Sequence, residues 1–161
     1  MTWNHVADLE LRARRLAIKD AMILLDPDAE SPEWPNVTVD PGLYAFEIHV
    51  RETLYCARLR VVPAGTNPTL GRKLADLSVD HAKAAVIDYD TFLATVSSDF
   101  DSYEEWTGME LDDELSLNFS GRIDFGAASL VYVTSGSGDG TYPVFELLEG
   151  DKVVGIQCHF D

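Results

Sequence analysis

The residues best suited to bind a ligand are the glycines and carboxylates of the segment Ser135-Gly136-Ser137-Gly138-Asp139-Gly140. Carbonyl groups of this segment and Asp139, with Asp80 or Asp88 from a neighbouring strand, are the hard oxygen ligands that calcium prefers, and the ion needs about six to eight of them. Asp139, Asp80 and Asp88 are therefore candidate ligands for calcium or magnesium, while the favoured expectation is that the chain holds no cofactor. The competing interpretation is a structural loop, in which the glycines supply positive φ angles and Asp139 bonds nearby backbone N–H groups.

Catalysis by an activated serine is not indicated. Ser135 or Ser137 would need His81 or His159 as a base, and the G-x-S-x-G pattern that exposes a nucleophile is absent. A phosphate-binding loop is disfavoured too, because Thr-Tyr-Pro-Val follows the glycines where Lys-Ser/Thr and a helix are required. The sequence therefore favours a protein that is not an enzyme.

A second group of candidate residues is the acidic stretch 99–114, where carboxylates surround Tyr103, Trp106 and Met109 at helical spacing. Aromatic anchors inside a charged rim are typical of protein interfaces. We expect a docking surface for a basic partner protein, formed by Asp101, Tyr103, Glu104, Glu105, Trp106, Asp112 and Asp113. The alternatives are that the charge serves only solubility and that Trp106 belongs to the core.

The charge is unevenly distributed along the chain. The formal net charge is −16, and residues 74–161 contain three Lys and Arg against eighteen Asp and Glu, whereas residues 1–73 contain nine against ten. A basic surface is what binds phosphate, so nucleic acid is not expected as a partner. The longest apolar run, residues 21–25, is far shorter than the roughly 20 residues that span a bilayer, so we expect neither a membrane partner nor a membrane segment.

The elements that position these residues follow from local patterns. Alternating apolar residues predict a β-hairpin over residues 43–62, with Glu47, His49, Arg58 and Arg60 on a solvated face. Strands are predicted at 21–25, 82–87 and 130–134, helices at 91–96 and 99–115, and a terminal hairpin over 142–160 with its turn at Gly150-Asp151.

These elements predict a mainly β protein, a β-rich α+β fold in which an antiparallel sandwich or half-open barrel carries one or two short helices. We expect a single acidic domain over residues 1–161. Cys56 and Cys158 lie in apolar strand-like runs, typical of buried thiols in a reducing compartment, and residues 1–20 hold too many charges for a signal peptide. Both observations favour the cytoplasm.

Four short patterns follow one another along most of the chain: Asp26-Pro27; Pro41-Gly42-Leu43-Tyr44 with Ala57-Arg58; Val79-Asp80 with Asp88; and Ser135 to Val144. Together they resemble an uncharacterised bacterial family, the domain of unknown function numbered 4241. The chain departs from the family pattern at His81-Ala82, where small residues leading to glycine are favoured. The resemblance implies a β-rich fold and brings no established activity.

Two classes of function remain. The first is a non-enzymatic acidic binding protein, of the immunity or antitoxin type, that covers a basic partner. The second is a metal- or small-ligand-binding β domain that uses the glycine-rich loop 135–140.

Overall fold

The computed structural model describes residues 2–21, 35–51, 55–79, 82–136 and 139–161. In chain order the elements are β1 (Asn4–Leu11), β2 (Arg15–Asp20), β3 (Asn36–Thr38), β4 (Gly42–Arg51), β5 (Tyr55–Pro63), β6 (Thr69–Val79), β7 (Lys83–Asp88), α1 (Tyr89–Ser98), α2 (Phe100–Trp106), the π-helical turn η2 (Thr107–Leu111), α3 (Asp112–Leu117), β8 (Ser120–Phe125), β9 (Ala128–Thr134), β10 (Gly140–Glu149) and β11 (Lys152–His159).

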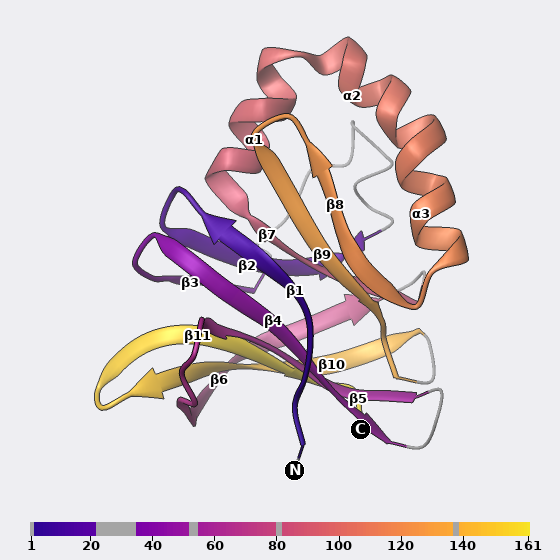
Figure 1. The fold of residues 1–161 in the computed structure, drawn as a ribbon. Coiled ribbons are helices and arrows are strands. Elements are labelled where there is room, and N and C mark those ends of the chain that lie inside the picture. The colour runs from indigo at the N-terminus through magenta and orange to yellow at the C-terminus, as the bar shows by residue number, and fades with distance from the viewer. Residues whose placement is uncertain (1, 22–34, 52–54, 80–81, 137–138) are drawn as a thin grey trace.

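The strands form two antiparallel sheets. One sheet has six strands in the order β1-β4-β5-β11-β10-β6, and the other has five in the order β3-β2-β7-β9-β8. The helices follow one another across the outer side of the five-stranded sheet (Figure 1). The predicted β-rich sandwich is therefore confirmed, with a helical layer added to one sheet.

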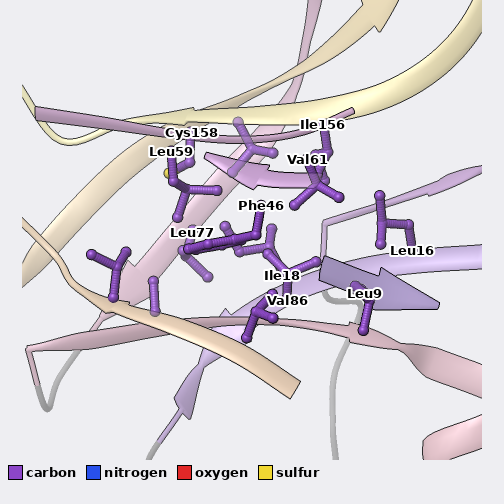
Figure 2. Close-up of a cluster of buried hydrophobic side chains, with 14 of the residues drawn as sticks. Leu9, Leu16, Ile18, Phe46, Leu59, Val61, Leu77, Val86, Ile156 and Cys158 are labelled. Atoms are coloured by element: carbon purple, nitrogen blue, oxygen red, sulfur yellow. The ribbon is translucent and has the colours of Figure 1, made fainter. Parts of the chain in front are cut away.

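The main core lies between the two sheets. The six-stranded sheet contributes Phe46 and Leu59, and the five-stranded sheet contributes Ile18 and Val86, all fully buried. Figure 2 shows these side chains gathered between the strands. Burying one such side chain stabilises the fold by about 1.5–3 kcal/mol, so this layer is the principal source of stability.

The predicted hairpin over residues 43–62 is confirmed as β4 and β5, which are paired from Tyr44 to Arg51. Its solvated face is less open than alternation predicted, because Arg60 is only 6% exposed. The Arg60 guanidinium lies 4.4 Å from the Trp3 ring centroid and its Nε donates to Glu47 Oε1 at 2.8 Å. The N-terminal tryptophan therefore covers this part of the outer face.

The C-terminal hairpin is confirmed as β10 and β11, and the turn between them holds Gly150 at a φ of +64°. The predicted strand at 82–87 is confirmed as β7, and the predicted helices as α1 and the run from α2 to α3. Most of the predicted strand at 21–25, together with Asp26-Pro27, lies outside the described residues.

Candidate functional site

The acidic stretch is helical because its polar residues cap the helices and its apolar residues face the sheet. Asp88 begins α1 and its Oδ2 accepts from Thr91 Oγ1 at 2.8 Å. Asp99 begins α2, where its Oδ1 accepts from Ser102 N at 3.3 Å. Side chains that satisfy the first N–H groups of a helix fix where it starts. From Phe100 the chain then remains helical through α2, η2 and α3.

Six carboxylates point outward from this helical run, and we call them the acidic helical face. They are Asp101, Glu104, Glu105, Glu110, Asp112 and Asp113. All six residues are exposed, and among the described residues none of them forms an ion pair with Lys, Arg or His. The reason is local, because the sequence holds no Lys, Arg or His between residues 84 and 121.

This concentration of charge opposes helix stability. Asp101 lies three and four residues before Glu104 and Glu105, and like charges at these helical spacings cost about 0.2–0.5 kcal/mol per pair. Glu114 stands near the end of the run, where the helix dipole favours a cation, and the last turn of α3 contains no Lys or Arg. A cationic surface placed against the face would relieve both costs.

Tyr103 and Trp106, predicted as interface anchors, are not on this face. They are 3% and 7% exposed and belong to the cluster between the helices and the five-stranded sheet. Phe125 of β8 packs against both, with ring centroids 5.7 Å from Tyr103 and 5.0 Å from Trp106. Because β8 and β9 supply an internal partner for both rings, neither projects from the acidic helical face, and their role as anchors for a partner stays a prediction.

The apolar side chains that do reach the surface here are different ones. Met109 of η2 is 64% exposed, Leu117 at the end of α3 is 81% exposed and Phe100 at the start of α2 is 42% exposed. Met109 shares the helical spacing of Tyr103 and Trp106, but the π-helical turn begins between Trp106 and Met109 and changes the direction in which later residues point. Met109 is thus an apolar group inside the acidic helical face.

A pocket of about 430 Å³ opens where this run meets the turn between β8 and β9. Glu105, Trp106, Met109 and Glu110 line it from the helical side, together with Ser102, and Asp124, Phe125 and Gly126 line it from the turn. Gly126 has a φ of +58°, which allows the turn to close tightly beside the helix. Asp124 and Phe125 were not predicted as site residues, although Gly126 next to them is a turn signal.

The indole of Trp106 forms one wall of this pocket. Its Nε1 is buried and donates to no acceptor among the described residues. A buried donor left without an acceptor costs about 1–3 kcal/mol. The pocket therefore combines unpaired carboxylates, an aromatic wall and an unsatisfied N–H group.

The candidate metal ligands are not brought together. Asp139 Oδ1 accepts from the backbone N–H of Ala82 at 2.9 Å, just before β7, whereas Asp88 is the last residue of β7. Asp88 lies six positions after Ala82 along an extended strand, a distance of about 20 Å. Asp139, which is bonded to Ala82, therefore cannot share one ion with Asp88. The third predicted ligand, Asp80, lies outside the described residues.

Both aspartates have structural contacts instead. Asp88 is 3% exposed, and its Oδ2 accepts from the backbone N–H groups of Arg12 and Ala13 at 2.8 and 3.0 Å. It therefore joins the turn between β1 and β2 to the start of α1. In the part of the chain that the structure describes, no three His, Cys, Asp or Glu side chains are grouped to hold a metal ion.

The glycine-rich segment also differs from the loop interpretation in detail. Gly136 has the positive φ, +44°, that the interpretation requires, but Gly140 is already part of strand β10. A β-carbon on Gly140 would lie 2.9 Å from the ring of Tyr142. Asp139 bonds across to Ala82, which itself has a φ of +59°. The segment thus ties the chain before β7 to the start of β10.

The two cysteines are free and buried. Burial raises the pKa of Cys56 to about 12 and raises the pKa of Cys158 as well. Thiols are nucleophilic as thiolates, so neither sulfur is activated for chemistry.

No protein-family model, curated protein or solved structure matches the chain. The resemblance to the domain of unknown function 4241 therefore stays a prediction. Within the described residues no helix is long and apolar enough to cross a membrane.

Proposed function

We propose that the chain is a non-enzymatic binding protein, of the immunity or antitoxin type, whose acidic helical face covers a basic surface of a partner protein. The observation that carries this proposal is the set of six exposed, unpaired carboxylates on a helical run without a single cation. Met109, 64% exposed among them, supplies an apolar contact. The cytoplasm is the compartment in which we expect the complex to form.

The charge arrangement supports a role in association rather than in folding. The exposed carboxylates repel one another in the free protein, and a basic partner removes that repulsion. A field of one sign also steers an oppositely charged partner and raises the association rate, by about 10- to 1,000-fold at low salt. Exposed carboxylates that lower the stability of the free protein are consistent with a role in binding a partner.

Interaction kinetics test the proposal. The partner is captured from a lysate of the source organism with the wild-type chain, identified, purified and measured by surface plasmon resonance. The test variant neutralises Glu104→Gln, Glu105→Gln, Asp112→Asn and Asp113→Asn. The control variant removes the same charge from the six-stranded sheet, at Glu10→Gln, Asp76→Asn, Glu149→Gln and Asp151→Asn, all exposed residues.

We expect the test variant to associate at least about 10-fold more slowly at low salt, with a melting temperature close to that of the wild type. The association rate of the control variant should fall by less than about threefold, because its charges lie outside the acidic helical face. Added salt should reduce the difference between wild type and test variant. Equal association rates for wild type and the test variant would show that the acidic helical face is not the docking surface.

The variant Met109→Ser tests whether an apolar contact contributes to the complex in addition to the charge of the acidic helical face. The side chain is exposed, so its loss should leave the melting temperature within about 1–2 °C of the wild type. If Met109 inserts into the partner, dissociation should accelerate about 5- to 30-fold, which corresponds to about 1–2 kcal/mol. Ser116→Ala, also exposed on α3, is the matched substitution that should change neither rate.

A further inference from the structure

The pocket beside α2 is more specific than the charged face around it. It is bounded by the helical run from Ser102 to Glu110 and by the β8–β9 turn, so its two sides come from different elements of the chain. Its volume of about 430 Å³ lies in the lower part of the range for small-ligand pockets, about 300–1,000 Å³. This is room for one long side chain or a small organic cation.

The charge of the pocket is negative and largely unpaired. Glu105 and Glu110 lie on its helical side and form no ion pair with any described residue. Asp124, on the opposite side, accepts from Ser129 Oγ at 2.6 Å and lies 3.4 Å from Arg122 Nε. Asp124 is thus already held in place, whereas the two glutamates are available to a ligand with a positive charge.

The walls restrict which cation fits. Phe125 is partly exposed and packs at 5.0 Å, centroid to centroid, against Trp106, so an aromatic surface borders the carboxylates. A planar guanidinium stacks on aromatic rings, is weakly hydrated and donates to several carboxylate oxygens at once, whereas an ammonium is a compact and strongly hydrated charge. A divalent metal is not supported, because no three acidic side chains of the described chain are grouped around one point.

The unsatisfied indole N–H of Trp106 points to more than a free cation. It is a buried donor without an acceptor among the described residues, and it belongs to a side chain that lines the pocket. A peptide brings main-chain carbonyl groups next to each side chain, and such a carbonyl is an acceptor for an indole N–H group. A ligand with a guanidinium therefore matches the unpaired carboxylates of the pocket, and its neighbouring carbonyl would be an acceptor for the indole N–H group where binding exposes that group.

We propose that this pocket receives an arginine side chain of the partner, with its guanidinium between Glu105 and Glu110 and against Phe125. The inference rests on the proposed function and adds to it the residue type that the partner presents. The pocket would act as the specific contact, and the remaining carboxylates of the acidic helical face would act through their field.

Short peptides test the pocket without the partner. The probe is acetyl-Gly-Arg-Gly-amide, and the matched control is the same peptide with citrulline, which keeps the shape of arginine and lacks its charge. Binding is followed by two-dimensional NMR on the ¹⁵N-labelled protein, through the indole N–H signal of Trp106. That signal is assigned by its absence in Trp106→Phe, or, if this variant does not fold, by elimination with Trp3→Phe and Trp34→Phe.

We expect the arginine peptide to shift the Trp106 indole signal with saturation, and the citrulline peptide to bind at least about fivefold more weakly, as loss of about 1 kcal/mol of charge attraction requires. A lysine peptide should fall between the two. Equal shifts from the arginine and citrulline peptides would overturn the proposal, and so would the absence of any shift at the indole signal.

Paired variants then distinguish the pocket from the wider face. Glu105→Gln with Glu110→Gln should weaken the arginine peptide about 5- to 30-fold, because two exposed ion pairs are worth up to about 1 kcal/mol each. Asp112→Asn with Asp113→Asn removes the same charge outside the pocket and should change the affinity by less than about twofold. Equal losses in the two variants would mean a diffuse charge effect and would overturn the pocket.

The same variants separate failure of the pocket from failure of the docking surface. If the partner associates through the acidic helical face but Glu105→Gln with Glu110→Gln behaves like Asp112→Asn with Asp113→Asn, the pocket is wrong and the surface stands. If no basic partner associates through the face while the arginine peptide still binds at Trp106, the proposed function is wrong and the pocket binds a different arginine-containing ligand.

Discussion

Gly155 of β11 has no room for a side chain, and the cost of adding one can be worked out from the neighbouring strand. A β-carbon there would lie 2.2 Å from the carbonyl oxygen of Val61 and 3.4 Å from Leu147 Cδ1. The oxygen belongs to the backbone of β5 and cannot rotate away, so β5 and β11 would have to separate by about 1 Å to reach ordinary contact.

That separation acts on the pairing of Ile156 with Val61, in the middle of the six-stranded sheet. Overpacking costs about 1–3 kcal/mol, and each weakened ladder hydrogen bond costs about 1 kcal/mol more. Gly155→Ala should therefore lower the free energy of unfolding by about 2–4 kcal/mol. At about 2–4 °C per kcal/mol for a chain of this size, the melting temperature should fall by about 4–16 °C.

Urea unfolding followed by circular dichroism measures this change, and an unchanged slope with denaturant shows that the loss lies in the folded state. Gly108→Ala is the matched control, because a β-carbon on Gly108 meets nothing within 4 Å in η2. Alanine is favoured over glycine in a helix by about 0.5–1 kcal/mol, so the control should be as stable as the wild type or more so. A Gly155→Ala protein that unfolds at the urea concentration of the wild type would refute the close approach of β5 and β11.

Four further predictions concern stability. Burial lowers the pKa of Lys19 from 10.5 to about 7, and because the unfolded chain keeps that proton to higher pH, the free energy of unfolding should rise by about 1–2 kcal/mol from pH 7 to 8.5, below the pH at which the cysteines of the unfolded chain ionise. In Lys19→Met, urea titrations at each pH should show a smaller rise. Ala82→Gly should stabilise the protein by about 0.5–1 kcal/mol in thermal melts, because a φ of +59° strains alanine and suits glycine. Asp88→Ala should lower the free energy of unfolding by about 2–4 kcal/mol, measured by calorimetry, because three donors lose their acceptor. Millimolar calcium should leave the melting temperature of the wild type unchanged. Trp106→Ala should lower stability by about 3–5 kcal/mol in the absence of any partner, since the ring is buried.

The strands with clear alternation could be predicted from sequence alone. Tyr44, Phe46 and Ile48 stand at every second position and all three are buried in β4. Such a pattern survives because one side of the strand faces the core along most of its length. The glycine turn before β11 is equally local, since it depends only on the conformation of the turn residues.

Other strands were not predicted, because their burial depends on distant elements. In β6 only Leu77 and Val79 are buried, since the strand lies at the edge of its sheet and is exposed over most of its length. The opposite case is β2, an interior strand of its sheet. Its Lys19 and Asp20 are almost completely buried, although charged residues usually indicate exposure. Neither arrangement produces the alternation from which strands are recognised.

The charge of the candidate site could be predicted from sequence, but the contacts between its side chains could not. Exposure of Asp101 and Asp112 follows from their type, because unpaired carboxylates stay in water. The burial of Trp106 depends on Phe125, a residue of β8 that no local pattern revealed as a strand. Sequence therefore indicated which segment is acidic and exposed, while the pocket arises only once two distant segments meet.

The two chain ends lie on the side of the molecule away from the helices (Figure 1). Trp3 stacks on Arg60 and Asp161 pairs with Arg58 Nε at 3.1 Å, so both ends are held against the six-stranded sheet. A biotin tag or fluorescent fusion attached through a spacer at either end would therefore hold the protein on a sensor chip with its acidic helical face directed into solution. Random coupling through lysines could instead attach the protein through Lys83, at the start of β7 in the sheet that carries the helices. It would also break the hydrogen bond that Lys83 Nζ donates to Thr134 Oγ1. Attachment through a chain end therefore leaves the acidic helical face accessible in every molecule, so that measured binding rates do not depend on how the protein is immobilised.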